Sequence, residues 1–400
     1  MRTSIRARAG RRWNVGKRGM LTALCVAGAV SFTAGGAVSG ATTHPASASS
    51  SLLSATQTST IKAALAAARK PSRWTAGGPA FSAKSLKGKT VWLLNDATNQ
   101  WADNFAAGVK SAVLAAGLKY AEGTGGPGGT NDAQAIENAV NEHVDAIIEI
   151  ANPNLVSSAL VKAKAAGIPV ILAFDGDAHQ PTATEKGLGI KAIADYCYSC
   201  TGYLAAEYEI LHDGDKVVSQ VEQFPGNTSS DTIAKGWVAA LHKFCPSTCS
   251  TSYVNLNLAG AYIQSVQSGA QVAAQGGKVN VLFPVYDFLM AFMLPELTAA
   301  NAQSRIAMAS ENADLAQMQE LAAGVSVNAN VGNPVAWDGW SAVDQTLRVL
   351  KHLPPVANEN VPVRLFDPSN IASVNLTQNP ANWYGTATYG LDYEKLWGLR

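Results

Sequence analysis

The stretch VDAIIEIANPNLVSSALVKAKAAGIPVILAF, residues 144–174, contains two short apolar runs separated by one helical segment. The runs at 146–150 and 169–174 have the length and the branched side chains of buried strands. The segment between them, about 155–166, is rich in Ala and Lys and stops at a glycine, which is typical of a helix end. A strand, a helix and a second strand in this order predict a right-handed crossover between parallel strands.

The same alternation extends in both directions along the chain. Upstream, two more strands are expected at 91–94 and 118–121, with helices between the strands. Downstream, the series restarts and predicts strands at 216–221, 252–256, 279–283, 305–309, 325–327 and 361–365. The fold class predicted is therefore α/β, with two doubly wound parallel-sheet lobes joined by a three-segment hinge.

The lobe boundaries follow from where the series restarts, and the chain of 400 residues is long enough for two domains. We expect the first lobe to comprise residues 88–190 and 329–362. The second lobe is expected to comprise 191–328 and 363–400, including a C-terminal extension. The hinge crossings are then expected near residues 190, 329 and 362.

The first 48 residues have the pattern of a signal peptide. Basic residues before position 20 are followed by the apolar run 20–38 and by Ala46-Ser47-Ala48, which fits an A-x-A cleavage site. This predicts an exported protein, extracellular or associated with the cell surface, and periplasmic if the organism has an outer membrane. A retained membrane anchor and a lipid attached to Cys25 are the alternatives. Residues 49–87 are expected to form a tether with one short helix.

Charge and motifs exclude several classes of function. The chain has 30 basic residues, and seven of them precede residue 20, so 23 remain against 29 acidic ones in the rest of the chain. That balance argues against nucleic-acid binding. The glycine-rich run 123–129 lacks the spacing of a phosphate-binding loop, and no G-x-S-x-G elbow occurs. We therefore predict no enzyme activity, no cofactor and no metal.

Four cysteines follow the signal peptide, as the two close pairs Cys197/Cys200 and Cys245/Cys249. An even number of cysteines in an exported protein favours two local disulfides. A zinc site is the alternative, because C-x2-C is a common ligand spacing. The predicted fold separates the pairs to opposite ends of one lobe, which favours the disulfides.

The segments Val144-Asp145-Ala146-Ile147-Ile148 and Ala166-Gly167-Ile168-Pro169-Val170 resemble the corresponding pair in type 1 periplasmic binding proteins of the sugar-binding, ribose-binding-protein-like kind. The resemblance covers roughly 88–366, with weaker matches at 225–229 and 339–344. It implies a monomeric solute-binding protein that captures a small ligand, a sugar or sugar-like molecule, between its lobes. It also implies a membrane permease of an ABC importer as the partner.

The resemblance places the ligand-binding groups at strand ends that face the cleft. The residues of this chain at those positions are Asn99, Trp101, Asp175, Tyr286, Asp287, Glu311, Asn312 and Asn330, and Asn95 after the first strand is expected to supply a further hydrogen bond. Aromatic faces for a ligand are expected from Trp101, Tyr286, Phe288 and Trp337.

Three departures from the family pattern bear on the ligand. Gly176 and Asp231 stand where the family commonly has arginine, and Ser310 replaces a common aspartate. These departures predict a more aromatic and less charged pocket than one built for a pyranose sugar. An aromatic or other small metabolite, bound for uptake or for a sensor, is therefore the alternative ligand. A hydrolase or redox enzyme on a similar frame is the third hypothesis.

Overall fold

The computed structural model describes residues 53–95, 100–125, 129–174, 176–177, 180–257, 260–385 and 388–400. The predicted signal peptide and two of the predicted ligand residues, Asn99 and Asp175, lie outside the described residues. Within these described ranges, none of the helices combines the length and the hydrophobicity that a membrane span requires.

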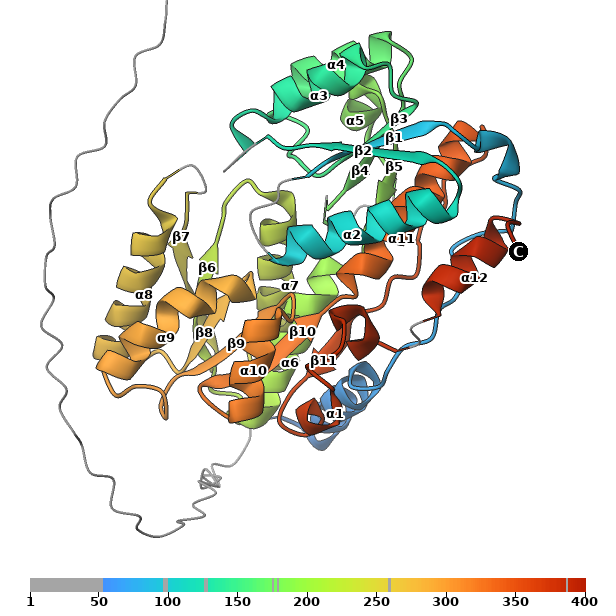
Figure 1. The fold of residues 1–400 in the computed structure, drawn as a ribbon. Helices are drawn as coiled ribbons and strands as arrows, with labels where there is room; N and C mark the ends of the chain where they lie inside the picture. The colour runs from blue at the N-terminus through green and yellow to red at the C-terminus, as the bar shows by residue number, and fades with distance from the viewer. Residues whose placement is uncertain are drawn as a thin grey trace, which may run out of the picture. The chain divides into compact units, whose positions relative to one another are not determined.

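The first lobe is built on a five-stranded parallel sheet in the order β2-β1-β3-β4-β5 (Figure 1). Its strands are β1 (Thr90–Leu94), β2 (Lys119–Gly123), β3 (Ala146–Glu149), β4 (Val170–Ala173) and β5 (Ile190–Ala194). The helices of this lobe are α2 (Gln100–Ala115), α3 (Asp132–Asn141), α4 (Ser157–Ala165), α5 (Ala183–Leu188) and α11 (Val335–Leu350). Helices α3 and α4 pack together on one face of the sheet, and α2 and α11 pack together on the other.

The second lobe is built on a six-stranded sheet in the order β11-β10-β9-β8-β6-β7. Its strands are β6 (Val218–Gln223), β7 (Ser250–Asn255), β8 (Val281–Pro284), β9 (Ala307–Glu311), β10 (Val327–Gly332) and β11 (Arg364–Phe366). Only β11 is antiparallel to its neighbour. The helices of this lobe are α6 (Tyr198–His212), α7 (Thr228–Phe244), α8 (Tyr262–Gly276), α9 (Met290–Ala299) and α10 (Leu315–Ala323). Two parallel-rich sheets confirm the predicted fold class.

Three segments connect the two lobes, as predicted, but two of them lie a few residues later in the chain. The crossings fall at 195–197, between β5 and α6, at 333–334, between β10 and α11, and at 351–363, between α11 and β11. The first two differ from the expected positions because β5 continues to Ala194 and β10 continues to Gly332.

The segment expected to be a tether is packed against the protein. Helix α1 (Ala55–Ala68) lies on α6 and β11 of the second lobe, where Ile61 and Leu65 are fully buried. Just after the helix, the Arg69 guanidinium donates to the Asp367 carboxylate at 2.6 Å. An apolar stripe on an Ala-rich helix is enough to dock it, and the composition of the segment did not reveal that stripe.

The segment after α1 and the C-terminal extension run together from the second lobe to the first. Ser72 and Gly385 form an isolated bridge, and the Phe81 and Ala83 amides donate to the carbonyls of Leu396 and Trp397. Helix α12 (Tyr389–Leu396) then packs on α11 (Figure 1). The two ends of the described chain therefore add connections between the lobes beyond the three crossings.

Removing the buried side chain at the centre of α1 should loosen the N-terminal segment. We expect Leu65→Ala to increase the rate at which a protease cleaves between α1 and β1, because Leu65 is fully buried against the second lobe. Lys62→Ala on the exposed face of α1 is the matched control and should leave the rate unchanged. Equal cleavage of both variants would mean that α1 is not held by this contact.

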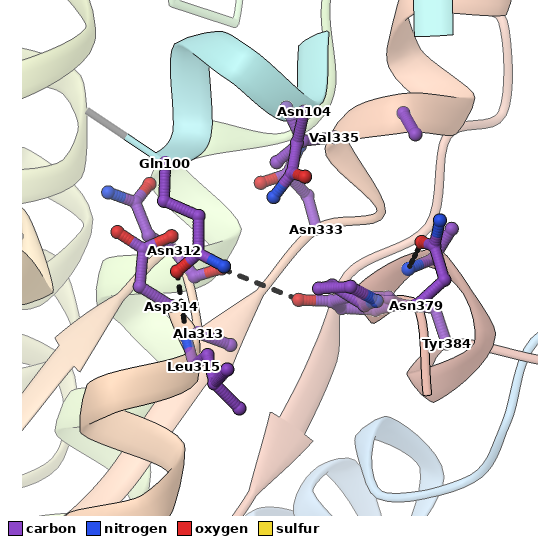
Figure 2. A pocket seen from close by; sticks show the side chains of 13 residues that line it. Gln100, Asn104, Asn312, Ala313, Asp314, Leu315, Asn333, Val335, Asn379 and Tyr384 are labelled. Carbon is purple, nitrogen blue, oxygen red and sulfur yellow. Dashed lines mark hydrogen bonds between the residues drawn. The ribbon is translucent and has the colours of Figure 1, made fainter. Parts of the chain in front are cut away.

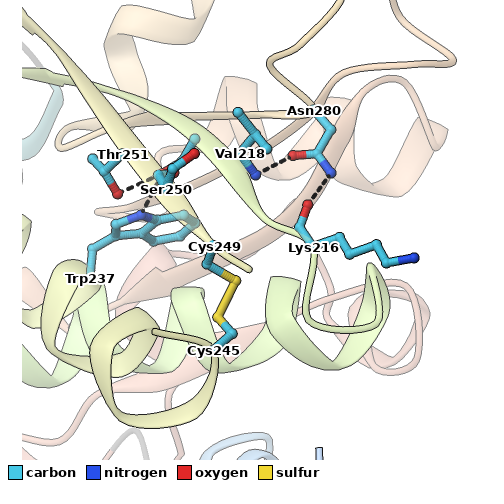
Figure 3. Close-up of a disulfide and its surroundings, with 9 residues drawn as sticks. Lys216, Val218, Trp237, Cys245, Cys249, Ser250, Thr251 and Asn280 are labelled. Carbon is cyan, nitrogen blue, oxygen red and sulfur yellow. Dashed lines mark hydrogen bonds between the residues drawn. A yellow bond between two sulfur atoms is a disulfide. The ribbon is translucent and has the colours of Figure 1, made fainter. Parts of the chain in front are cut away.

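Two disulfides join the four cysteines in the local pairs. Cys197 and Cys200 have Cα atoms 5.2 Å apart at the start of α6, and Cys245 and Cys249 have Cα atoms 5.4 Å apart in the turn between α7 and β7. Figure 3 shows the second disulfide and, in the same view, the Asn280 side-chain amide, which bonds the backbone of Lys216 and Val218 at the start of β6. This disulfide therefore closes a turn at the amino end of the sheet, away from the lobe interface.

Glycines let one pair of helices in each lobe approach closely. A Cβ added at Gly236 of α7 would lie 2.1 Å from the carbonyl oxygen of Ser199, and one added at Gly202 of α6 would lie 2.1 Å from that of Ile233. In the first lobe, a Cβ added at Gly108 of α2 would lie 2.2 Å from the Ala336 oxygen at the start of α11. These approaches fix the positions of α2 and α7, whose N-terminal ends face the other lobe.

Candidate functional site

A cavity of about 440 Å³ lies where the carboxyl ends of the two sheets face each other. Both lobes line it, as expected for a binding site of open α/β sheets. The first lobe contributes Trp101, Ile150 and Phe174, and the first crossing and the start of α6 contribute Tyr196 and Tyr198. The second lobe contributes Phe224, Asn227, Ser229, Tyr262, Tyr286, Phe288, Phe292, Glu311 and Asn312.

The first lobe, the first crossing and the start of α6 together supply one aromatic wall of this cavity. Trp101 stands at the start of α2, and its ring centroid lies 4.1 Å from that of Phe174, which follows β4 directly. Tyr196 and Tyr198 follow β5, and their ring centroids lie 4.0 Å apart. Phe174 and Tyr198 are 6.5 Å apart, so the four rings form one continuous packed surface.

The second lobe supplies the other aromatic wall. The Phe224 ring, after β6, lies 5.8 Å from that of Tyr262 at the start of α8 and 6.0 Å from that of Tyr286 after β8. Tyr286 in turn stacks on Phe288 with centroids 6.1 Å apart. A ligand in the cavity therefore meets ring faces or edges from both lobes.

The polar groups of the second wall are bonded mainly to one another. Asn227 caps α7 by accepting from the Ser230 amide at 3.0 Å. The same Asn227 oxygen accepts from the Ser229 and Tyr286 hydroxyls at 2.8 and 2.9 Å. This shared acceptor holds the Tyr286 ring in place and occupies the Asn227 oxygen, whereas no hydrogen bond among the described residues uses the Asn227 NH2 group, which is left to donate to a ligand.

Glu311 is the acidic group of the cavity and comes at the end of β9. Its side chain is 1% exposed. Its carboxylate accepts from the Tyr196 hydroxyl at 3.2 Å, and the Asn312 side-chain amide, assigned so that its NH2 group faces the acid, donates to it at 2.7 Å. Burial, the charge of Asp287 and the charge of Asp314 all raise the pKa of Glu311 well above its usual range.

Two other predicted ligand residues lie behind Glu311 rather than in the cavity. The Asp287 carboxylate accepts from the Asn330 amide and from the Asp314 backbone N–H, both at 2.8 Å. Asn330 also accepts from the Ala313 amide at 3.0 Å. Asp287 and Asn330 therefore shape the turn that follows β9 and carries Asn312.

The backbone adopts unusual conformations at two positions that line the cavity. Phe174 has a φ of 71° and Asn312 has a φ of 95°, both in the left-handed region that non-glycine residues rarely adopt. The Asp195 carboxylate holds Phe174 in place by accepting from its amide at 2.7 Å. Such local strain is commonly stored at ligand-binding positions, where it directs a side chain toward a site.

A small polar pocket lies beside the main cavity, where both lobes meet the C-terminal extension (Figure 2). The Gln100 side chain of α2 accepts from the Leu315 amide of α10 at 3.2 Å, which is a direct bond between the lobes. The Tyr384 hydroxyl of the extension donates to the Asn312 carbonyl at 3.4 Å. The space left is about 10 Å³, room for about one water molecule, so this pocket connects the lobes and does not hold a solute.

Four predicted ligand residues therefore line the main cavity: Trp101, Tyr286, Glu311 and Asn312. Asn95 is not among the lining residues, and its amide donates to the Gly123 carbonyl at the edge of the first sheet. Phe288 lines the cavity as expected of an aromatic face. Trp337 does not, because it is buried against Tyr389 of α12 with ring centroids 5.2 Å apart.

Several lining residues were missed in the sequence. Tyr196 lies in the first hinge crossing and Tyr198 begins α6, and both lie later in the chain than the crossing expected near residue 190. Tyr262 and Phe292 come from helices α8 and α9, and Phe224 directly follows β6. The signal available for Phe224 was its position three residues after the strand predicted at 216–221, the same distance at which Tyr286 follows the strand predicted at 279–283.

Asp338, in the first turn of α11, makes the fold sensitive to pH. It is fully buried, it accepts from the Ser341 hydroxyl at 2.9 Å, and burial raises the pKa of its carboxyl to about 7. In the unfolded chain this carboxyl titrates at about pH 4. The stability that the buried neutral carboxyl contributes to the folded state is therefore complete below that pH, and it is lost as the pH rises toward the pKa of the folded state.

We therefore expect Asp338→Asn to flatten the pH dependence of stability. Between about pH 5 and pH 8 the wild type should lose about 3 kcal/mol more unfolding free energy than this variant. Urea denaturation at the two pH values measures the difference, with Glu142→Gln on the surface as the control. Parallel pH profiles for wild type and Asp338→Asn would contradict the buried, neutral carboxyl.

Comparison with known proteins bears on the fold and the family. The family profile described as periplasmic binding protein domain matches residues 90–354, more than half of the chain. A comparison with curated protein sequences gives no significant match.

Several solved structures share the fold at low sequence identity. An ABC sugar transporter subunit from Rhodobacter sphaeroides is 18% identical, with 71% of this chain and 100% of that chain covered and a TM-score of 0.61. An ABC transporter solute-binding protein from Agrobacterium vitis bound with alpha-D-tagatopyranose is 18% identical, with 75% and 100% covered and a TM-score of 0.65. One from Mycobacterium smegmatis with bound glycerol is 14% identical, with 75% and 99% covered and a TM-score of 0.63.

The two sheets, the cavity between their carboxyl ends and the matched family profile agree with the resemblance seen in the sequence. The chain belongs to the periplasmic binding protein domain family, whose members bind solutes and are not enzymes.

Proposed function

We propose that this protein is an exported receptor that captures one small molecule between its lobes and delivers it to the membrane permease of an ABC importer. The observation that carries the proposal is the 440 Å³ cavity, which residues of both lobes line at the carboxyl ends of their sheets. A ligand that bridges two hinged lobes stabilises their closed arrangement, and a permease can recognise that arrangement. Family membership supports a location outside the cytoplasm.

A sugar or sugar-like molecule is the first candidate ligand. Aromatic faces such as Trp101 and Tyr286 suit the apolar C–H faces of a sugar ring. Support also comes from the structural relatives, since the Agrobacterium vitis protein is bound with a tagatopyranose and the Mycobacterium smegmatis protein with glycerol. This candidate requires polar partners for several hydroxyl groups.

An aromatic or other small metabolite is the second candidate, and the composition of the walls favours it. Nine of the fourteen lining residues are aromatic. The polar side chains Asn227 and Ser229 already bond each other and Tyr286. A ligand with a large apolar surface and few polar groups fits such walls better than a polyhydroxylated ring does.

Thermal unfolding in the presence of sugars, polyols and aromatic metabolites tests the proposal. A ligand at about 100 times its dissociation constant should stabilise the protein by about 2.7 kcal/mol. Trp101→Ala should reduce that stabilisation, whereas Tyr253→Ala, which removes an exposed ring on β7 outside the cavity, should not. Equal loss of stabilisation in both variants, or in neither, would place the ligand elsewhere.

A further inference from the structure

The geometry points to an organic cation as the ligand: an amine or quaternary ammonium group that contacts Glu311 and an aromatic body held between the two ring walls. This inference rests on the proposed function, because it names the chemical class of the solute that the same cavity binds. Three observations carry it: an acid without a basic partner, ring walls on both sides and a buried hydroxyl without a hydrogen bond of good geometry.

The carboxyl group of Glu311 has no basic partner among the described residues. The two groups that bond it, the Tyr196 hydroxyl and the Asn312 amide, are neutral. The described lining residues include no Lys, Arg or His, and none of the ion pairs found in the described ranges includes Glu311. A buried carboxylate is costly unless a cation compensates it, so a bound cation would supply what the protein lacks.

The acidic residues behind Glu311 increase the preference of this cavity for a cationic ligand. Asp287 is fully buried directly behind the β9 turn, and Asp314 follows in the same turn. One Asp287 oxygen accepts from Asn330 and from the Asp314 amide, and both donors are neutral. The local charge at this end of the cavity is therefore negative or neutral, and it disfavours an anionic ligand.

The aromatic walls favour a cation as well. The faces of aromatic rings carry partial negative charge, and they attract ammonium groups within about 6 Å, more strongly when water is excluded. Trp101 and Phe174 belong to one wall, and Tyr286 and Phe288 belong to the other. The same rings provide apolar surface for the uncharged body of the ligand, so one lining serves both parts of an aromatic amine.

The Tyr198 hydroxyl supplies the third observation. Tyr198 is 2% exposed and lines the cavity, and its hydroxyl lies near that of Tyr196 but makes no hydrogen bond of good geometry among the described residues. A buried hydroxyl without a good hydrogen bond is unfavourable, and a ligand that bonds it removes that cost. A tyrosine oxygen can accept from the N–H of an ammonium group, and so it can share that group with Glu311.

A matched set of small probes tests the charge preference. The probes are 2-phenylethylammonium, 2-phenylethanol and phenylacetate, which share a ring and differ in charge, together with benzyltrimethylammonium. In titration calorimetry at about pH 8, we expect the two cations to bind at least about tenfold more tightly than the alcohol, and phenylacetate to bind most weakly.

Two variants separate the role of Glu311 from general effects of a buried acid. Glu311→Gln should weaken binding of the cations about tenfold or more and change binding of 2-phenylethanol little. The control is Glu222→Gln in β6, since Glu222 is also fully buried but does not line the cavity. This control should keep the order of the probes unchanged.

The inference is overturned if neither cation binds, if the alcohol or phenylacetate binds as tightly, or if Glu311→Gln binds the cations like the wild type. A sugar or polyol that stabilises the wild type and loses its effect in Trp101→Ala would then leave the proposed function standing. Failure of every solute class would count against the proposed function itself, so the two failures are distinguishable.

Discussion

Trp397→Ala should lower the free energy of unfolding by about 4 kcal/mol. Trp397 is fully buried between α12 and α11, and its ring stacks on Trp340 with centroids 5.5 Å apart. Its indole N–H donates to the buried Asp344 carboxylate at 2.7 Å, which Arg348 also contacts at 2.6 Å. The substitution leaves a large cavity and takes one donor from a buried charge, and both changes destabilise the folded state.

Urea denaturation at constant pH measures this loss. The matched control is Leu391→Ala on the same helix, because Leu391 is 43% exposed and its removal should change stability by about 0.5 kcal/mol or less. A Trp397→Ala variant that unfolds within about 1 kcal/mol of the wild type would contradict the account. It would mean that the C-terminal helix unfolds separately from the two lobes.

Gly236→Ala should destabilise the second lobe by about 3 kcal/mol, although it adds only one methyl group. The new Cβ would lie 2.1 Å from the backbone oxygen of Ser199, a contact that requires α6 and α7 to move apart. Asn227, the cap of α7, and Ser229 in its first turn lie at the cavity, and α6 begins at Tyr198, which also lines the cavity. The substitution should therefore also weaken ligand binding.

The same substitution at another helical glycine should have the opposite effect on the free energy of unfolding. Gly276 ends α8, and a Cβ added there would meet no atom within 4 Å. Because alanine favours the helix over glycine, Gly276→Ala should leave stability unchanged or raise it by up to about 1 kcal/mol. Similar effects of the two substitutions in urea denaturation would contradict the close crossing of α6 and α7.

The fold was predictable because its central strands are continuous apolar runs. Each residue of β3, Ala146–Glu149, is buried, and the run is easy to recognise from sequence. Strand β10 was predicted too early, at 325–327, because its polar residues conceal it. Asn330 is fully buried in that strand, and its amide is satisfied by Asp287 and Ala313, partners that lie far away in sequence.

The site was partly predictable because the ends of the apolar strands can be located in the sequence. Tyr286 and Glu311 reach the cavity because they lie at or directly after the carboxyl end of a strand, where the sequence pattern places them. Tyr262 and Phe292 come from the helices that follow, and only the packing of those helices brings their rings to the cavity. Trp337 occupied a suitable position along the chain, but the C-terminal extension covers it.

The most direct test of capture between two lobes is to change one wall at a time. With the compound that gives the largest stabilisation in the solute screen, calorimetry should show that Trp101→Ala in the first lobe and Phe288→Ala in the second each weaken binding about tenfold or more. If only one of the two substitutions weakens binding, the compound is held by a single lobe. That result would contradict a ligand clasped between both sheets.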